Sequence, residues 1–420
     1  MKPSGIEWIG DIPDDWEVRK LLSLFKEHKD RNKNLEEQNL LSLSYGKIKR
    51  KDINNNDGLL PASFETYNIV EKGDIVFRLT DLQNDKRSLR TGIVTQRGII
   101  TSAYVTIRPK IKLDSRFYHY LYHMYDICKV FYGMGDGVRQ GMGFEDLKNI
   151  PTLIPPLKTQ QKIADYLDEK CGEIDAPIAK QKESIEKLKA YKQSLISETV
   201  TKGLDKSAPL KPSGIDYLGD IPSHWEIKKL KFVANFNQNT LPEDTDGQFE
   251  LKYIDIGNVS SVDGIKEIQY FNFSNAPSRA RRIVKYGDII VSTVRTYLRA
   301  ITSIKEDYDN CICSTGFAVI TPKDNVQQDF VVYAIENESF IAQIIANSQG
   351  ISYPAINVSQ LENLKLAFPS VKEQKEIVDF LKTKLLEIDL TINKKQNIIQ
   401  KLDAYKKSLI FECVTGKRLV

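Results

Sequence analysis

The sequence has few of the residues that build metal centres or covalent cross-links. Its 420 residues include five cysteines and four histidines. The cysteines are odd in number and scattered, which is unlike a disulfide framework or a zinc site. They are Cys128, Cys171, Cys311, Cys313 and Cys413. Cys311 and Cys313 lack the spacing of a CxxC motif. His119 and His123 have the spacing of a helical metal pair, but no HExxH glutamate lies between them, so we expect no metal.

Long apolar runs are absent as well. No run reaches the roughly 18 residues that a membrane-spanning helix requires, and Met1-Lys2-Pro3-Ser4-Gly5 lacks the apolar core of a signal peptide. We therefore expect a cytoplasmic location. The hydrophobic content of 41% and the charged content of 28% are ordinary for a globular protein. The net charge of +4 is compatible with binding to nucleic acid but does not require it.

Motifs of several enzyme classes are also missing. There is no Walker A sequence, which argues against nucleotide hydrolysis. The (Asn/Asp)-Pro-Pro-(Tyr/Phe) tetrapeptide of amino-methyltransferases is absent, since the Pro-Pro pair at 155–156 lies between Ile154 and Leu157. The glycine-rich residues 133–137 follow a helical stretch instead of a strand, which favours a loop over a nucleotide site. No nuclease-like carboxylate cluster stands out, so the sequence favours a binding protein without catalysis of its own.

What the sequence does contain is a long internal repeat. The repeated elements are KPSGI at 2–6 and 211–215, GDIP at 10–13 and 219–222, WE at 16–17 and 225–226, GDI at 73–75 and 287–289, and YK at 191–192 and 405–406. The spacing is 209 residues near the start of each copy and 214 residues further on. Solenoid repeats are about 20 to 50 residues long. The period therefore predicts a duplicated domain with two similar sites.

Each half has a mixed front followed by a helical tail. Short β-rich runs such as 74–77 and 103–107 alternate with Asn, Asp and Gly clusters. Helices are predicted at 115–132 and 328–346, the first from the helical spacing of Phe117, Leu121, Met124, Cys128 and Phe131. We therefore expect an α+β fold with two similar globular domains and an internal pseudo-two-fold repeat.

The tails carry heptad seams. The first consists of Leu167, Cys171, Ile174, Ile178, Gln181, Ile185, Leu188, Lys192 and Leu195, and the second of Leu381, Leu385, Ile388, Ile392, Lys395, Ile399, Leu402, Lys406 and Leu409. Four heptads in each tail predict two long coiled-coil helices. Pro177 interrupts the first, so we expect a kink or short break near Ala176, with Asp175 capping the restart.

The lysines in the seams indicate how the two helices pair. A parallel pair in register would bring Lys192 against Lys406, where two ammonium groups repel each other and lose hydration. An antiparallel pair centred on Gln181 and Lys395 separates these lysines by roughly 33 Å. We therefore favour an antiparallel coiled coil within the chain. The alternative is a coiled coil formed with another subunit.

Taken together, the repeated elements resemble those of a known family. They include GDIPxxWE near each start, GDI(V/I) in the middle, the segments 155–164 and 369–378, and the segments 191–203 and 405–416. In this order, twice over, they resemble the specificity (S, HsdS) subunit of type I restriction–modification systems across essentially the whole chain. The resemblance implies target recognition domains at 1–154 and 205–367, and spacer helices at 155–204 and 368–420.

The resemblance also implies a function and a set of partners. Each domain would read one half of a bipartite, asymmetric double-stranded DNA site. The helices would set the spacing and dock two modification subunits. Those subunits would use S-adenosylmethionine on adenine, and restriction subunits joined through them would use ATP and Mg, whereas this chain would bind no cofactor. The alternatives are a non-catalytic coiled-coil scaffold or an inactive recognition subunit.

Candidate DNA-contacting residues are basic, amide or aromatic residues in the divergent loops, because such side chains contact phosphates and base edges. In the first domain they are Lys47, Lys49, Arg50, Lys51, Lys86, Arg87, Arg90, Arg139 and Gln140. In the second they are Arg279, Arg281, Arg282, Arg295, Arg299, Gln349 and Tyr353. Candidates for contact with the modification subunits are Tyr191, Lys192, Tyr405 and Lys406, although simple solvation of a helix surface explains these four equally well.

Overall fold

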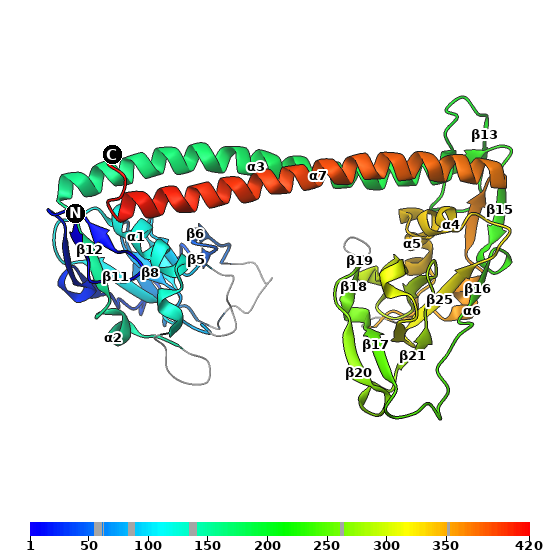
Figure 1. The fold of residues 1–420 in the computed structure, drawn as a ribbon, viewed down its shortest axis with the longest axis horizontal. Coiled ribbons are helices and arrows are strands. Elements are labelled where there is room, and N and C mark those ends of the chain that lie inside the picture. Colours follow the sequence, from blue (N-terminus) through cyan, green and yellow to red (C-terminus); the bar gives the residue numbers. More distant parts are fainter. Residues whose placement is uncertain (54–60, 62, 83–88, 134–140, 261–263, 351–352) are drawn as a thin grey trace. The chain divides into compact units, whose positions relative to one another are not determined.

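The computed structural model describes the chain except for residues 54–60, 62, 83–88, 134–140, 261–263 and 351–352 (Figure 1). The chain divides into two compact units. Unit 1 consists of residues 1–182 and 396–420, and unit 2 of residues 183–395. Two long helices, α3 (Leu157–Lys202) and α7 (Val371–Val414), belong partly to each unit. The domain boundaries expected at 154, 204 and 367 stay a prediction.

Unit 1 is built around a four-stranded antiparallel sheet in the order β4-β11-β8-β9. Its strands are β1 (Lys2–Pro3), β2 (Asp11–Ile12), β3 (Glu17–Lys20), β4 (Phe25–Glu27), β5 (Leu41–Ser44), β6 (Lys47–Arg50), β7 (Asn68–Val70), β8 (Ile75–Phe77), β9 (Thr91–Ile93), β10 (Gly98–Ile100), β11 (Val105–Pro109) and β12 (Pro151–Ile154). Its shorter helices are α1 (Ser115–Ile127) and α2 (Phe144–Leu147). The runs at 74–77 and 103–107 thus supply β8 and β11, as predicted.

Unit 2 repeats this sheet in the order β16-β25-β22-β23 and adds a second one, β20-β17-β24-β21. Its strands are β13 (Leu210–Pro212), β14 (Asp220–Pro222), β15 (Glu226–Lys229), β16 (Ala234–Phe236), β17 (Glu250–Ile254), β18 (Val259–Ser260), β19 (Gly264–Ile265), β20 (Gln269–Asn272), β21 (Ala280–Ile283), β22 (Ile289–Ser292), β23 (Ile301–Ser303), β24 (Ile312–Ser314), β25 (Phe317–Pro322) and β26 (Lys365–Phe368). Its shorter helices are α4 (Gln328–Ile335), α5 (Glu338–Ala346) and α6 (Val358–Glu362).

Two predicted helices differ from those observed. The helix expected at 115–132 ends at Ile127, so Cys128 lies exposed at its C-cap instead of on the apolar face. The helix expected at 328–346 is two helices, α4 and α5. The break has a local cause, because the Asn337 side chain accepts a hydrogen bond from the Ser339 backbone N–H at 2.7 Å and so caps a new helix.

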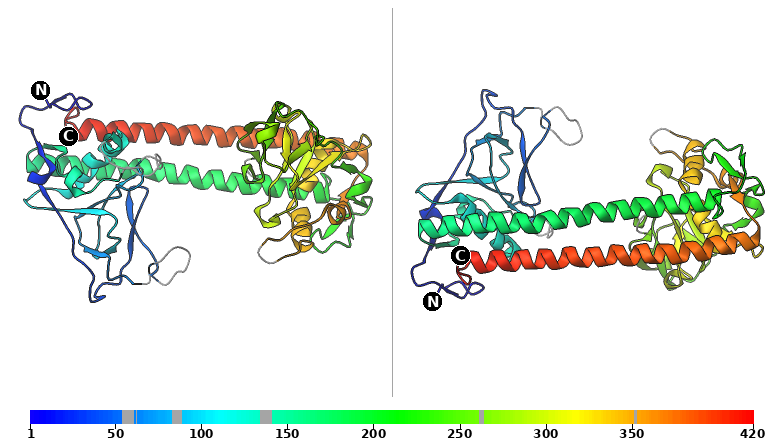
Figure 2. Two further views of the ribbon diagram at one scale, coloured as in Figure 1. Left: turned by 90° about the horizontal axis from the view of Figure 1, so that it is seen from below. Right: turned by 90° about the horizontal axis from the view of Figure 1, so that it is seen from above.

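The long helices pair in an antiparallel sense. In unit 1, Lys406 of α7 donates to Asp175 of α3 at 2.7 Å. In unit 2, Lys192 of α3 donates to Asp389 of α7 at 2.7 Å. As the residue number rises along α3 from 175 to 192, the number of its partner on α7 falls from 406 to 389. This order confirms the antiparallel coiled coil. In each unit the two helical segments lie side by side (Figure 2), and seam residues such as Ile178 and Leu385 are buried.

Pro177 does not break α3, contrary to the expectation. The helix continues through it from Leu157 to Lys202. Proline has no N–H to donate to the carbonyl one turn earlier, but the flanking seam residues Ile174 and Ile178 are both buried in the core of unit 1. Tertiary packing of the apolar face therefore sustains the helix across the missing hydrogen bond.

Each long helix ends on a glycine that packs against a tryptophan. Gly203 follows α3 with φ +73°, and Gly416 follows α7 with φ +72°, a left-handed conformation that glycine adopts without strain. A Cβ at Gly203 would lie 3.2 Å from Trp225, and one at Gly416 would lie 3.3 Å from Trp16. These contacts account for the tryptophan of the repeated Trp-Glu element, since each tryptophan packs against the end of a long helix. Within the described residues, no helix is long and apolar enough to span a membrane.

Candidate nucleic-acid interface

The repeated Gly-Asp-Ile element shapes the entry into the central strand of each unit. Asp74 accepts a hydrogen bond from the Glu71 backbone N–H at 2.9 Å, and Asp288 accepts the equivalent bond from Lys285 at 2.8 Å. The glycine before each aspartate has positive φ, +94° at 73 and +85° at 287. The element therefore closes a tight turn before β8 and β22. The far end of each of these strands leads into a loop that carries candidate residues.

In each unit that loop is joined to a second loop from later in the chain. The Met142 N–H donates to the Leu79 carbonyl at 2.9 Å, and the Ile356 N–H donates to the Thr293 carbonyl at 2.9 Å. The paired segments are 79–82 with 141–143 in unit 1, and 293–299 with 348–350 and 353–356 in unit 2. We call each pair a two-loop platform. In unit 2 the structure thus brings candidate Arg295 together with Gln349 and Tyr353, which lie more than 50 residues later in the sequence.

The platform of unit 2 is held by further contacts. The hydroxyls of Thr296 and Ser348 lie 2.8 Å apart. Gln349 and Ala355 exchange backbone hydrogen bonds of 2.8 and 2.9 Å. The guanidinium of Arg295 lies 4.9 Å from the centre of the Tyr353 ring, which makes a cation–π contact. Of the predicted residues, Arg295, Gln349 and Tyr353 are therefore gathered on one exposed surface.

Arg299 lies on the same platform but is differently engaged. Its side chain forms an ion pair with Glu338 of α5 at 2.5 Å. Arg295 and Arg299 both have left-handed backbones, with φ of 51° and 53° on either side of the short 3-10 helix Thr296–Leu298. Tyr297 and Leu298 in that helix are each 51% exposed and were not among the predicted residues. Their signal in the sequence was weak, because a Tyr-Leu pair between arginines also suits a buried strand.

In unit 1 the structure corrects the assignment of Arg90. Its side chain is completely buried and donates to the carbonyls of Arg78, Thr80 and Asp81 at 2.8 to 3.2 Å. Arg90 therefore organises the loop from inside and cannot reach DNA in this structure. Lys86, Arg87, Arg139 and Gln140 lie outside the described residues.

The basic hairpin of unit 1 is exposed. Lys47, Lys49 and Arg50 lie on β6, Lys51 follows it, and all four side chains are exposed. Lys47 also lies 3.8 Å from Asp175 of α3, which brings the hairpin next to the long helix. This cluster is a surface cation patch suited to phosphates, and its contact with DNA stays a prediction.

The three arginines near β21 differ in accessibility. Arg279 is exposed. Arg281 is half-buried, with its guanidinium 4.6 Å from the Phe273 ring centre. Arg282 is also half-buried, and desolvation lowers the pKa of its side chain. Among the residues that the structure describes, its Nε has no hydrogen-bond partner. Of the three, Arg279 is the best placed for a contact with solvent or a ligand.

The candidates on the long helices fall into two kinds. Tyr191 and Tyr405 are 55% and 54% exposed. Lys192 and Lys406 use their ammonium groups in the helix-pairing bonds described above, which partly satisfies them within the chain.

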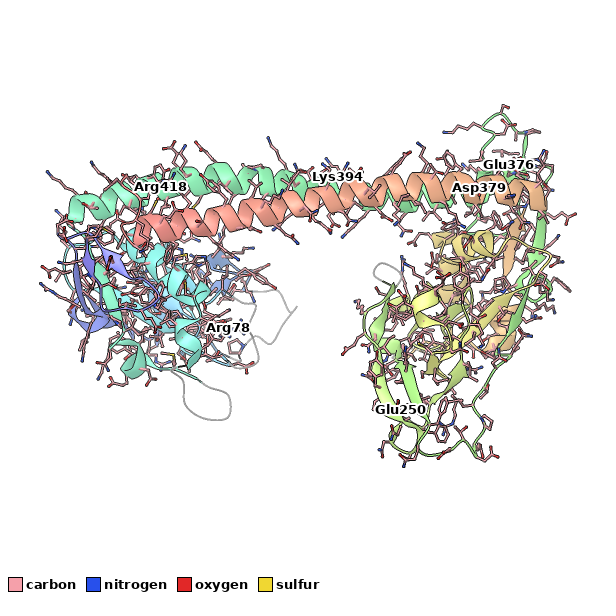
Figure 3. The ribbon with its side chains drawn as sticks, viewed as in Figure 1. Arg78, Glu250, Glu376, Asp379, Lys394 and Arg418 are labelled. Atoms are coloured by element: carbon pink, nitrogen blue, oxygen red, sulfur yellow. The ribbon has the colours of Figure 1, made fainter. Side chains whose placement is uncertain are left out.

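Exposed charged side chains, including Glu376, Asp379 and Lys394, line α7 within unit 2 (Figure 3). Leu386 and Leu390 are also exposed there, at 61% and 51%, and sequence reasoning missed them because they lie outside the seam.

Two further features concern chemistry at buried positions. Within the described part of the chain, no group of three or more His, Cys, Asp or Glu side chains is arranged to hold a metal ion. His119 and His123 lie on α1 with ring centres 6.1 Å apart, and burial lowers their pKa values to about 3 and about 4. These histidines are therefore neutral packing residues of unit 1 at neutral pH.

Comparison with known proteins agrees with this architecture. A family described as "Type I restriction modification DNA specificity domain" matches residues 13–194 and 222–401, once in each half. The MjaVIII type I restriction enzyme specificity subunit of Methanocaldococcus jannaschii is 24% identical over 97% of this chain and 93% of that protein. The putative MjaX specificity subunit of the same organism is 24% identical over 97% of this chain and 95% of that protein.

A solved structure shares the fold. A chain from a study of complex assembly and conformational transition in the type I R-M system aligns with a TM-score of 0.66 and 14% identity. The alignment covers 97% of this chain and all of that chain. The family match spans most of the sequence in two copies, as the duplicated units do. The chain therefore belongs to the family of type I restriction–modification DNA specificity subunits.

Proposed function

We propose that unit 1 reads one half of a bipartite, asymmetric DNA site and that unit 2 reads the other half. The observation that carries this proposal is the two-loop platform, which both units build on the same backbone hydrogen bond. The side chains around that bond differ, so two different half-sites are expected. Loops held by a rigid sheet are well suited to recognition, because their positions are fixed while their side chains vary freely.

In this proposal α3 and α7 act as a spacer and as the docking surface for two modification subunits. Support comes from Tyr191 and Tyr405, which occupy equivalent positions in the repeats and are exposed to the same extent. Two equivalent surfaces on one chain suit two copies of one partner. The partners would carry adenine methylation with S-adenosylmethionine, as well as ATP- and Mg-dependent restriction. This chain would bind no cofactor and would have no catalysis of its own.

Methylation mapping tests the proposal. The chain is co-expressed with its modification subunit in a host without adenine methylation, and modified adenines are mapped across the genome. The expected result is one bipartite motif with a fixed gap. Exchange of residues 1–150 for those of another specificity subunit should change only one half of the motif. A stable complex that methylates nothing, or that recognises a single continuous motif, would overturn the proposal.

DNA binding by the assembled complex provides a second readout. Neutralisation of phosphates by lysine and arginine releases counterions, so affinity should fall steeply as salt is added. A scaffold that binds only proteins would show no such dependence. The complete chain should be used in this complex, because each unit alone offers only one half of the expected contacts and the linked pair gains from effective concentration.

A further inference from the structure

Arg295 has an unusual backbone conformation that its surroundings impose. Its φ and ψ are 51° and 49°, in the left-handed region that residues other than glycine seldom adopt. Both neighbours are fixed to the second loop of the platform. Val294 forms a β-bridge with Ala355, and buried Thr296 contacts the Ser348 hydroxyl and the Pro354 carbonyl. Strain of this kind persists where the fold requires a particular side-chain position.

The side chain of Arg295 is oriented but not neutralised. Tyr353, which is 66% exposed, supports the guanidinium from one face. Within the described residues, this guanidinium has no hydrogen-bond acceptor and no carboxylate partner, whereas neighbouring Arg299 is paired with Glu338. A guanidinium supported on its face keeps its N–H donors free at its edge. Arg295 therefore offers an oriented, unused pair of donors to a ligand.

We propose that Arg295 reads a guanine in the major groove of the half-site bound by unit 2, with Tyr353 as the residue that positions it. The two N–H donors of its fork would bind N7 and O6 of the guanine, which is the commonest specific contact between proteins and DNA. This inference rests on the proposed function and adds to it a base and a residue. Unit 1 has Asp81 at the equivalent position, also left-handed with φ 57°, so the contact would be specific to unit 2.

A phosphate contact is the main competing role, and the two roles give different results. Loss of a phosphate contact weakens binding about equally on all sequences, whereas loss of a base contact relaxes the preference at one position. Methylation motifs are therefore compared for the wild-type complex and for complexes with R295A, R295K, Y353A and Y353F. The half-site read by unit 1 serves as an internal control in every map.

R295A should reduce the preference for guanine at one position of one half-site by roughly 5- to 150-fold. R295K should also relax it, because an ammonium cannot form the two-donor fork. Y353F should keep the preference, since the ring remains, and Y353A should weaken it. Y270A is the matched control, because Tyr270 on β20 is 72% exposed in the same unit and lies outside the platform.

An unchanged motif in R295A, or a uniform loss of methylation with the guanine preference intact, would overturn the inference. If the R295A complex methylates nothing, its DNA binding is measured instead, by competition between DNAs that differ only at this guanine. Lost discrimination there would support the base contact, and retained discrimination would overturn it. A wild-type complex without any bipartite motif would instead overturn the proposed function itself.

Discussion

The two units attach their long helices at equivalent positions with opposite charges. In unit 1, Arg116 of α1 pairs with Asp168 of α3 at 2.9 Å. In unit 2, Asp329 of α4 pairs with Lys382 of α7 at 2.6 Å. The ion pair is kept, but both of its members have changed sign. Neither partner alone would suit the other unit, so the two units share the contact but not the identity of either residue.

Contacts with the backbone behave differently. Gln160 accepts from the Asp114 N–H at 3.0 Å and donates to the Pro155 carbonyl at 2.8 Å. Gln374 repeats both bonds, accepting from the Gln327 N–H and donating to the Pro369 carbonyl, each at 2.9 Å. A backbone N–H or carbonyl is the same whatever residue carries it, so it cannot compensate for the replacement of its side-chain partner. The glutamine is accordingly the same in both units. A side-chain partner can change, and in the ion pair it has.

The repeated aspartate shows both behaviours in one residue. Asp74 and Asp288 each accept from a backbone N–H three residues earlier. Their other partners differ, since Asp74 forms two bonds of 2.7 Å with Arg108 whereas Asp288 accepts from the Thr321 hydroxyl at 2.6 Å. Burial raises the pKa of Asp288, although the hydrogen bonds that it accepts and the charge of nearby Lys285 lower it. The comparison therefore separates two kinds of contact: bonds from a side chain to the backbone, which both units share, and bonds between side chains, which differ between the units.

The largest effect is expected when a glutamine that serves the backbone is removed. Q160L and Q374L each leave a part-buried N–H and a buried carbonyl without partners, which should cost about 2–5 kcal/mol. The two losses should be similar because the two sets of bonds are similar. Urea unfolding followed by pulsed hydrogen exchange and mass spectrometry reports each unit separately. A loss below about 1 kcal/mol in either unit would contradict the argument.

The second prediction is that the stability of the two units changes in opposite directions with pH. Burial raises the pKa of Glu336 in unit 2 to about 7, although nearby Lys192 and Lys305 lower it. Its native form therefore holds a proton that the unfolded form releases above about pH 4.5, and stability falls as pH rises towards 7. E336Q should stabilise unit 2 at pH 8 by on the order of 2 kcal/mol and have little effect at pH 5.

Unit 1 should show the opposite dependence. Burial lowers the pKa of His123 to about 4, with Lys406 and Lys407 adding to the shift. The native form then lacks a proton that the unfolded form binds below about pH 6.5, so stability is lost as pH falls towards 4. Melting of the wild type, E336Q and H123Q between pH 4 and 8 measures both trends. Trends of the same sign in the two units would refute this comparison.

The third prediction uses the lysine–aspartate pairs between α3 and α7. K192M removes both bonds to Asp389 and should destabilise unit 2 by about 1–2 kcal/mol. K406M should destabilise unit 1 by less, because Lys47 lies 3.8 Å from Asp175 and still offers it a cation. The exchanged double variant K192D/D389K should recover part of the loss. Equal losses in K192M and K406M would show that Lys47 contributes nothing.

The smallest effect is expected from exchange of the inverted ion pair. D329R gives unit 2 the residue of unit 1 opposite Lys382 and should cost about 0.5–1 kcal/mol, since both side chains are partly exposed. K382D in the same chain should restore the lost stability. A double-mutant cycle over the two changes measures the coupling. If the double variant is no more stable than D329R, the ion pair is not what links α4 to α7.

The fold was largely predictable because its strongest signals are periodic. The heptad seams and their lysines predicted two antiparallel helices, and apolar runs predicted β8 and β11. The break at Asn337 was not predicted, because one capping side chain competes there with an otherwise continuous apolar pattern. The continuity of α3 at Pro177 was missed for the opposite reason, since packing of the helix outweighed a local signal.

The site was less predictable than the fold. An arginine in a loop gives the same sequence signal whether it is buried, as Arg90 is, or exposed, as Arg295 is. The difference arises from carbonyl groups that the fold gathers around Arg90 and that composition cannot reveal.

The makeup of unit 1 has a consequence for synthesis of the protein. Its core combines residues near the start of the chain, such as Trp16, with Leu409, Ile410 and Cys413 of α7. Residues 183–395 of unit 2 are synthesised before those last core residues. At about 5–20 residues per second, the apolar surface of the nascent unit 1 waits for roughly 10–50 s. During that interval the early segment is open to chaperones and proteases, so a translational pause late in the message should lower the yield of folded protein.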